Sequence, residues 1–164
     1  MFSKKLSDRM NEQIKHEFYS SYLYLAMSAY FQGINLPGFA HWMSVQSREE
    51  YSHAMKFFSH IIERGGKVEL EAIEKPKAEF KSPLDVMKKV LEHEQKVTAL
   101  INSLYELATK EKDYPGQIML QWFVTEQVEE EKSASEVLHL LKQIGDAPAG
   151  LIMLDRQLAA RKAD

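Results

Sequence analysis

The chain has 164 residues, 45% of them hydrophobic and 27% charged, which is the composition of a globular protein with one well-filled core. A formal net charge of −3, with both signs interleaved, gives no basic surface, so we expect no nucleic-acid partner. The absence of cysteine excludes disulfides and cysteine-ligated iron. No stretch approaches the roughly 18 apolar residues of a membrane span, and the N-terminal segment lacks an apolar signal core. We therefore expect a cytoplasmic protein without a membrane partner.

Apolar residues recur at spacings of three and four along four long segments, which is the periodicity of amphipathic helices. Glycine and proline separate these segments: Gly33 and Pro37 follow the first, and Gly65 follows the second. Ser82 directly before Pro83 is a typical helix start. The sequence thus predicts one domain spanning residues 1–164, with helices at about 6–32, 38–64, 83–111, 115–144 and, shorter, 149–161.

The lengths of the connections predict how the four long helices are arranged. The first and third connections are short, so each joins antiparallel neighbours. The middle connection, residues 66–81, has 16 residues and can span about 53 Å when extended. A helix of roughly 25 residues is about 38 Å long, so this connection can return along the whole bundle. The second and third helices can therefore lie parallel. The predicted fold is all-α: a four-helix bundle with one long crossover connection and a short C-terminal fifth helix.

A carboxylate interrupts the apolar stripe near the middle of each long helix: Glu17, Glu50, Glu94 and Glu130. Burying even one unpaired carboxylate costs several kcal/mol. No Lys or Arg lies on the apolar stripes themselves, so we infer that two metal cations compensate the charge. His53 lies three residues after Glu50 and projects from the same helix face, as a pair of ligands must. Di-iron bundles carry two such Glu-x-x-His pairs, whereas the fourth helix here offers Gln127 three residues before Glu130.

Other polar residues have more ordinary interpretations. The remaining histidines are expected in the core or on the surface without a metal: His16, His41, His60, His93 and His139. Tyr24 lies two turns from Glu17 on the same face, where core packing and a hydrogen bond to a ligand are both open. Three glutamates lie one residue away from the ligand face, so a solvated surface is their first interpretation and a third, weaker iron position the second: Glu49, Glu126 and Glu129.

The segments that carry the acids resemble those of the haem-free ferritins of bacteria and archaea. The matching segments are residues 17–24, 49–54, 93–94 and 126–131, and the resemblance extends over the whole chain. It implies a ferritin-like bundle in which Glu17, Glu50 and His53 hold one iron. Glu50 would bridge to a second iron held by Glu94 and Glu130, with Gln127 beside it and Tyr24 just outside the ligands. The third iron position would use Glu49, Glu126, Glu129 and Glu130.

The resemblance also implies the activity and the assembly. Ferritins of this kind oxidise Fe(II) with O2 or H2O2 at a ferroxidase centre and store ferric oxyhydroxide inside a homo-oligomeric shell of 24 subunits, without haem. Haem-binding relatives carry Met where this chain has Tyr51, and they have a second Glu-x-x-His pair that this chain lacks. The neutral amide of Gln127 suggests a second iron position that empties more easily. The apolar fifth segment, residues 151–154 with Leu158, could dock on its own bundle, but we expect it to be buried against neighbouring subunits.

Two other classes of function are compatible with parts of this pattern. The first is a different di-metal carboxylate enzyme, such as a manganese catalase or a di-iron protein that oxidises an organic substrate. The missing second Glu-x-x-His pair and the lack of an added substrate domain argue against it. The second is a helical interaction protein whose acids are merely solvated. It predicts a purified protein without metal.

Overall fold

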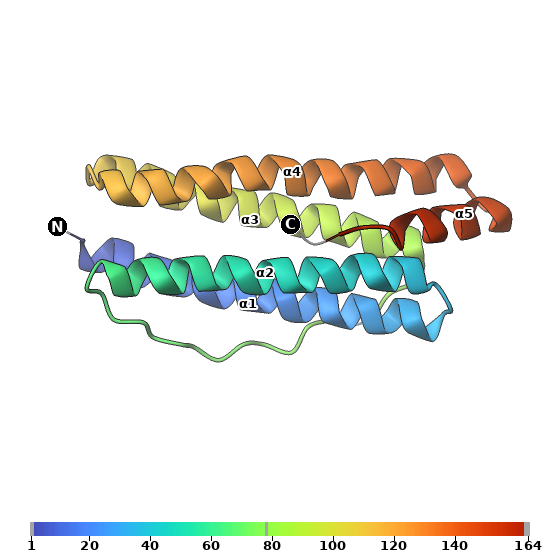
Figure 1. The fold of residues 1–164 in the computed structure, drawn as a ribbon, viewed down its shortest axis with the longest axis horizontal. Helices are drawn as coiled ribbons and strands as arrows, with labels where there is room; N and C mark the ends of the chain where they lie inside the picture. Colours follow the sequence, from blue (N-terminus) through green and yellow to red (C-terminus); the bar gives the residue numbers. More distant parts are fainter. Residues whose placement is uncertain (1, 78, 163–164) are drawn as a thin grey trace.

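The computed structural model describes residues 2–77 and 79–162, which contain five helices (Figure 1). Their bounds agree with the predicted ones within two residues, except that the fifth helix ends at Leu158 rather than about 161. The single-domain prediction also included Met1, Ala78, Ala163 and Asp164, which lie outside the described residues. The helices are α1 (Lys4–Gly33), α2 (Pro37–Glu63), α3 (Pro83–Lys110), α4 (Tyr114–Ile144) and α5 (Pro148–Leu158).

Local capping explains where the helices begin and end. The Ser3 and Ser82 side chains accept hydrogen bonds from the backbone amides of Leu6 and Asp85, which would otherwise lack partners at the starts of α1 and α3. Gly145 ends α4 with a positive φ of 57°, a conformation that favours glycine. Among the described residues, no helix is long and apolar enough to cross a membrane.

The four long helices form two antiparallel pairs, α1 with α2 and α3 with α4, and α2 runs parallel to α3 (Figure 1). The described parts of the crossover, residues 64–77 and 79–82, follow α1 back along the bundle (Figure 1). Asn11 fastens the crossover there, because its amide nitrogen donates to the Lys67 carbonyl at 3.0 Å and its oxygen accepts from Glu69 N at 2.8 Å. Lys15 adds an ion pair with Glu71 at 3.0 Å. The predicted bundle with one long crossover is confirmed.

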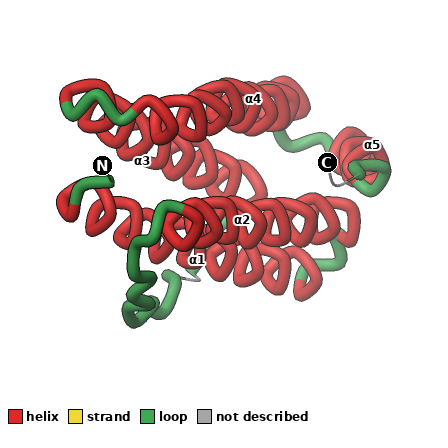
Figure 2. Tube along the Cα trace, turned by 60° about the vertical axis from the view of Figure 1, so that its left-hand side comes forward, coloured by secondary structure: helices red, strands yellow, loops and turns green. Residues whose placement is uncertain are grey.

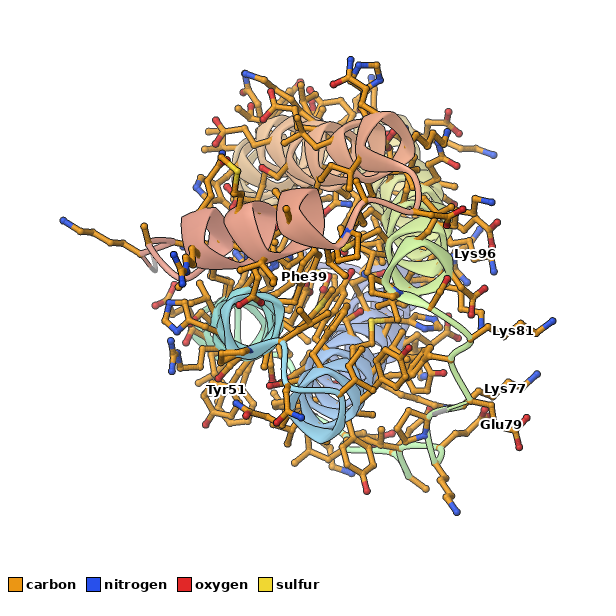
Figure 3. The ribbon with its side chains drawn as sticks, turned by 90° about the vertical axis from the view of Figure 1, so that its right-hand side faces the viewer. Phe39, Tyr51, Lys77, Glu79, Lys81 and Lys96 are labelled. Atoms are coloured by element: carbon orange, nitrogen blue, oxygen red, sulfur yellow. The ribbon has the colours of Figure 1, made fainter. Side chains whose placement is uncertain are left out.

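Two separate apolar clusters make up the core. One contains Phe31 stacked on Phe39, with their ring centroids 4.9 Å apart, and also buries part of α5. Figure 3 shows Phe39 between the helices, whereas Tyr51 lies on the outer surface. The other contains Phe57 stacked on Phe123 at 4.3 Å. Every long helix contributes to both clusters, and its central carboxylate lies between the two contributions. The polar middle of the bundle is therefore enclosed by apolar layers at both ends.

Helix α5 packs on the start of α2, at the end of the bundle away from the N-terminus (Figure 2). A Cβ atom on Gly38 would lie 1.6 Å from the Asp155 carbonyl oxygen, so only glycine permits this close approach. The Asp155 carboxylate also accepts a hydrogen bond from Phe39 N at 2.9 Å. Leu154 and Leu158 are buried in the chain's own core, so the expectation that neighbouring subunits bury them is wrong. The close fit of α5 on α2 explains this difference.

Candidate metal centre

Among the described residues, polar side chains meet in the middle of the bundle, and seven of them, each at most 5% exposed, form the candidate centre. All six residues predicted to lie beside the two irons are among them. The helices position them because these side chains share a helix face with apolar residues that pack into the core. They are Glu17 from α1, Gln46, Glu50 and His53 from α2, Glu94 from α3, and Gln127 and Glu130 from α4.

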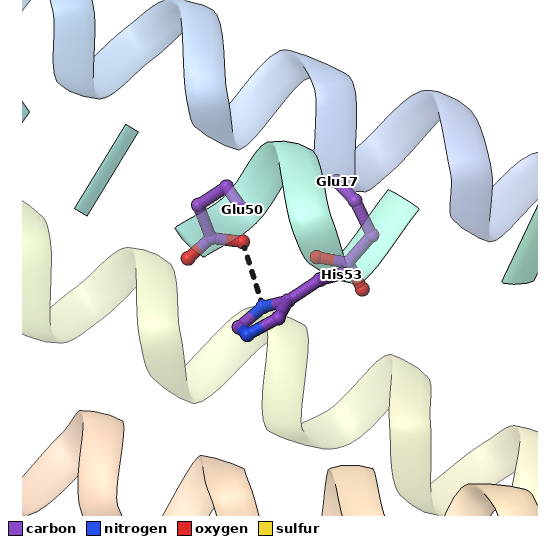
Figure 4. A group of neighbouring side chains, drawn as sticks. All are labelled: Glu17, Glu50 and His53. Atoms are coloured by element: carbon purple, nitrogen blue, oxygen red, sulfur yellow. Dashed lines mark ion pairs between the residues drawn. The ribbon is translucent and has the colours of Figure 1, made fainter. Parts of the chain in front are cut away.

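Glu17, Glu50 and His53 form the first group of potential ligands (Figure 4). One ligand atom from each lies within 4.8 Å of the others, and His53 Nδ1 is 3.4 Å from Glu50 Oε2. Gln13 orients Glu17 by donating a hydrogen bond to its Oε1 at 2.8 Å. The predicted spacing of Glu50 and His53 therefore does place both side chains beside Glu17.

His53, Glu126 and Glu130 form a second group with the same close spacing, and His53 Nε2 lies 3.8 Å from Glu126 Oε1. Glu94, expected beside Glu130, belongs to neither group. Its carboxylate instead accepts hydrogen bonds from the Tyr24 hydroxyl and, at 3.2 Å, from Gln127 Nε2. For Tyr24, the structure therefore shows a hydrogen bond to a candidate ligand together with complete burial.

Gln46 is a central residue to which the sequence pattern assigned no role. Its side chain is completely buried, and its Nε2 donates to Glu130 Oε2 at 2.6 Å and to Glu50 Oε1 at 3.3 Å. One amide thus links carboxylates from α2 and α4. The available signal was a polar residue inside the apolar stripe of α2, one turn before Glu50.

The three glutamates assigned to a third iron position are not gathered in one group. Glu126 lies beside His53, whereas Glu129 is exposed. Glu49 forms an ion pair with Arg161, with Nη2 and Oε2 2.6 Å apart. Arg161 therefore brings a positive charge to the edge of the centre, although no Lys or Arg lies on the apolar stripes of the helices. It comes from beyond the end of α5 and is 112 residues from Glu49 in sequence.

Burial makes ionisation of the central carboxylates unfavourable. It raises the pKa of Glu17 and of Glu50 well above the ordinary value, and neighbouring carboxylates add to both effects. Burial likewise raises the pKa of Glu94 to about 7, although hydrogen bonds from Tyr24 and Gln127 oppose the rise. For Glu130, burial and the charge of Glu94 raise the pKa to about 8. A bound cation would reverse this preference and favour the ionised acids.

Three buried side-chain oxygens accept no hydrogen bond from any described residue: Glu17 Oε2, Gln46 Oε1 and Glu50 Oε2. A buried acceptor without a partner costs about 1–3 kcal/mol, and a buried charge costs more. Metal ions or their bound waters would supply the missing partners. Carboxylate oxygens with one imidazole form a donor set that suits Fe(II). The residues present therefore fit a two-metal centre.

Comparison with known proteins agrees with this geometry. Residues 7–144 match the Ferritin-like domain family. The chain belongs to the ferritin family. It is 44% identical over 161 residues to a bacterial non-heme ferritin of Bacteroides fragilis, covering 98% of this chain and 100% of that one. It is 40% identical over 164 residues to the bacterial non-heme ferritin of Staphylococcus haemolyticus, covering 100% and 99% of the two chains.

Solved ferritin structures share both the fold and the chain length. An open-pore ferritin from the hyperthermophilic archaeon Archaeoglobus fulgidus superposes with a TM-score of 0.98 at 47% identity, covering 99% of this chain and 100% of that one. An engineered closed form of the Archaeoglobus ferritin gives the same TM-score and identity, with both chains fully covered. These matches confirm the resemblance to haem-free ferritins of bacteria and archaea, and they confirm the ferritin-like bundle with its short fifth helix.

Proposed function

We propose that this ferritin oxidises Fe(II) to Fe(III) with O2 at its buried centre and stores ferric oxyhydroxide inside a shell of 24 copies. Membership of the ferritin family supports iron storage as the broad function. The observation that carries the finer proposal is the buried group of Glu17, Glu50 and His53, in which two carboxylate oxygens accept no hydrogen bond from any described residue. Cations are the partners that such oxygens require.

Six residues of the centre have a proposed role toward the iron substrate. Glu17 and His53 hold the first Fe(II), and Glu50 lies between the first position and the second. Glu94 and Glu130 hold the second Fe(II), where the neutral amide of Gln127 adds no charge. The second position is the weaker one in this scheme.

Proton transfer follows from the raised pKa values of the carboxyl groups. Without metal, burial favours their protonated forms, so Fe(II) binding releases protons. Each of two Fe(II) ions then gives one electron to a single O2, and the reduced oxygen takes up protons to leave as H2O2. Because the oxidant is reduced by a pair of irons held together, free superoxide is avoided.

Assembly into a shell is supported by apolar side chains that remain on the surface. Leu25 on α1 is 53% exposed and Tyr51 on α2 is 54% exposed. On α5, Ile152 and Met153 are 51% and 73% exposed. Contacts with further copies of the chain would bury these residues. For these two α5 residues, burial by neighbouring subunits therefore remains a proposal.

Oxidation kinetics test the proposal. Two Fe(II) per subunit are added to the anaerobic apoprotein, air is admitted, and the near-ultraviolet absorbance of Fe(III) is followed. Glu50→Ala should lose the fast phase, whereas Glu106→Ala, which changes an exposed glutamate on α3, should keep it. Equally slow oxidation in wild type and both variants would refute the ferroxidase centre. Size-exclusion chromatography tests the shell separately, because 24 copies elute at several hundred kilodaltons.

A further inference from the structure

Arg161 follows the C-terminal end of α5 and lies along the first half of α2. Its carbonyl oxygen is 2.8 Å from His41 Nε2, and its guanidinium carbon lies 4.3 Å from the centroid of the Trp42 ring. Its Nη2 reaches Glu49 Oε2 at 2.6 Å. Trp42 and Glu49 are seven residues apart and therefore lie two turns apart on one face of α2. The segment after α5 thus extends a positive charge to the residue directly before Glu50.

The Arg161–Glu49 ion pair is partly shielded from solvent, but one guanidinium nitrogen donates no hydrogen bond to any described residue. The side chains of Arg161 and Glu49 are 20% and 11% exposed. Arg161 Nη1 is buried and has no hydrogen-bond partner among the described residues. Salt screens such a pair much less than it screens a surface pair. The guanidinium group therefore keeps most of its electrostatic influence on nearby groups.

This influence extends to a proposed iron ligand. Glu49, one of the acids assigned to the third iron position, lies 2.6 Å from the guanidinium Nη2 through its Oε2. The same positive charge repels a cation that approaches the carboxylates at this edge of the centre. Arg161 thus competes with a metal cation for the Glu49 carboxylate.

This competition would concern the acids assigned to the third iron position. Glu126 and Glu130 lie close to His53, where a further cation could bind. Glu49 would have to join them, but Arg161 holds its carboxylate. A cation that recruits Glu49 must break this pair and leave the guanidinium group without its partner.

We propose that Arg161 lowers the affinity of the third iron position by holding Glu49 as its counter-ion. Iron then passes through this position without being retained there. Arg161 is a positioning residue in this scheme, because it acts through Glu49. The inference rests on the proposed function, since it takes the buried centre as a metal site.

Zn²⁺ titration of the assembled apoprotein tests this, using calorimetry together with metal analysis after gel filtration. Wild type should bind two Zn²⁺ per chain tightly and a third weakly. Arg161→Gln should bind the third about tenfold more tightly, because one charge is removed from partly buried surroundings. Arg161→Lys keeps the charge and should stay near wild type. The matched control is Arg156→Gln, which changes an exposed arginine on α5 and should have no effect.

Further variants separate the possible outcomes. Combining Glu49→Gln with Arg161→Gln should abolish the tighter binding of the third Zn²⁺, because the Glu49 carboxylate is then missing as a ligand. A third affinity that is unchanged or weaker in Arg161→Gln, in an oligomer of normal size, would overturn the inference and leave Arg161 as an anchor for the chain. Arg161→Met keeps an unbranched side chain over Trp42 and repeats the test if Arg161→Gln fails to assemble. Failure of the proposed function looks different, because wild type would then bind no Zn²⁺ tightly.

Discussion

Replacing Glu130 with glutamine should stabilise the metal-free protein near neutral pH. Burial raises the pKa of Glu130 to about 8, compared with 4.5 for an ordinary glutamate. Between pH 4.5 and about pH 8, the Glu130 carboxyl keeps its proton in the folded state but releases it in the unfolded state. The unfolded state therefore binds fewer protons, and the free energy of unfolding falls as the pH rises. This contribution is fully present below pH 4.5 and is lost as the pH rises through about 8.

The size of the effect follows from the same values. The interval from pH 4.5 to pH 7 covers 2.5 pH units. Each unit changes the free energy of unfolding by about 1.4 kcal/mol for one proton. The free energy of unfolding of wild type therefore falls by about 3 kcal/mol through Glu130. Glu130→Gln has no proton to release and avoids the loss. Its amide oxygen can still accept the hydrogen bond from Gln46, which reaches Glu130 Oε2 at 2.6 Å in wild type.

Denaturant unfolding of the chelator-treated protein at a fixed protein concentration measures the difference. The free energy of unfolding of Glu130→Gln, relative to that of wild type, should rise by about 3 kcal/mol between pH 4.5 and pH 7. Added Zn²⁺ should stabilise wild type more than the variant. Glu106→Gln, an exposed control on α3, should follow wild type at every pH. A difference between Glu130→Gln and wild type that does not change with pH would refute the reasoning.

Three further predictions concern other contacts of the bundle. Gln46→Leu should weaken Zn²⁺ binding by roughly tenfold in calorimetry, because Glu50 and Glu130 lose the amide that links them; unchanged affinity would show that the link is not needed. Zn²⁺ binding at pH 6.5 should release protons, since burial raises the pKa of Glu50; heats that do not vary with the buffer's ionisation enthalpy would contradict this. Arg64→Ala should lower the unfolding free energy by about 3 kcal/mol, because Asp113, 5% exposed, loses a bidentate partner; a melting temperature equal to wild type would argue otherwise.

Helix periodicity made the inward direction of the central acids predictable. Glu17, Glu50 and Glu94 each lie among apolar residues at spacings of three and four, so a helix must turn them toward the core. The spacing of Glu50 and His53 was equally informative, because three residues bring two side chains onto one face. The same rule assigned Glu49 to a solvated surface. Its side chain is only 11% exposed because Arg161 covers it.

Contacts between distant segments were beyond this reasoning. Gln46 was visible only as a polar residue in an apolar stripe, since its link to Glu130 depends on how α2 faces α4. Gly38 directly follows Pro37 in the break between two predicted helices, and its role in letting the Asp155 backbone approach α2 left no signal there. Neither contact leaves a periodic pattern in the sequence, because its partner lies on another helix.

The sequence by itself determined the five helices, the crossover and the four acids that face the core, because these depend on local periodicity and on connection lengths. Only the tertiary structure decided how the acids pair, which of their oxygens accept no hydrogen bond from a described residue, and which arginine side chain reaches Glu49. Pairing depends on the register between helices, and the burial that raises the carboxyl pKa values arises only when all four helices pack. The placement of Arg161 beside Glu49 depends further on the docking of α5.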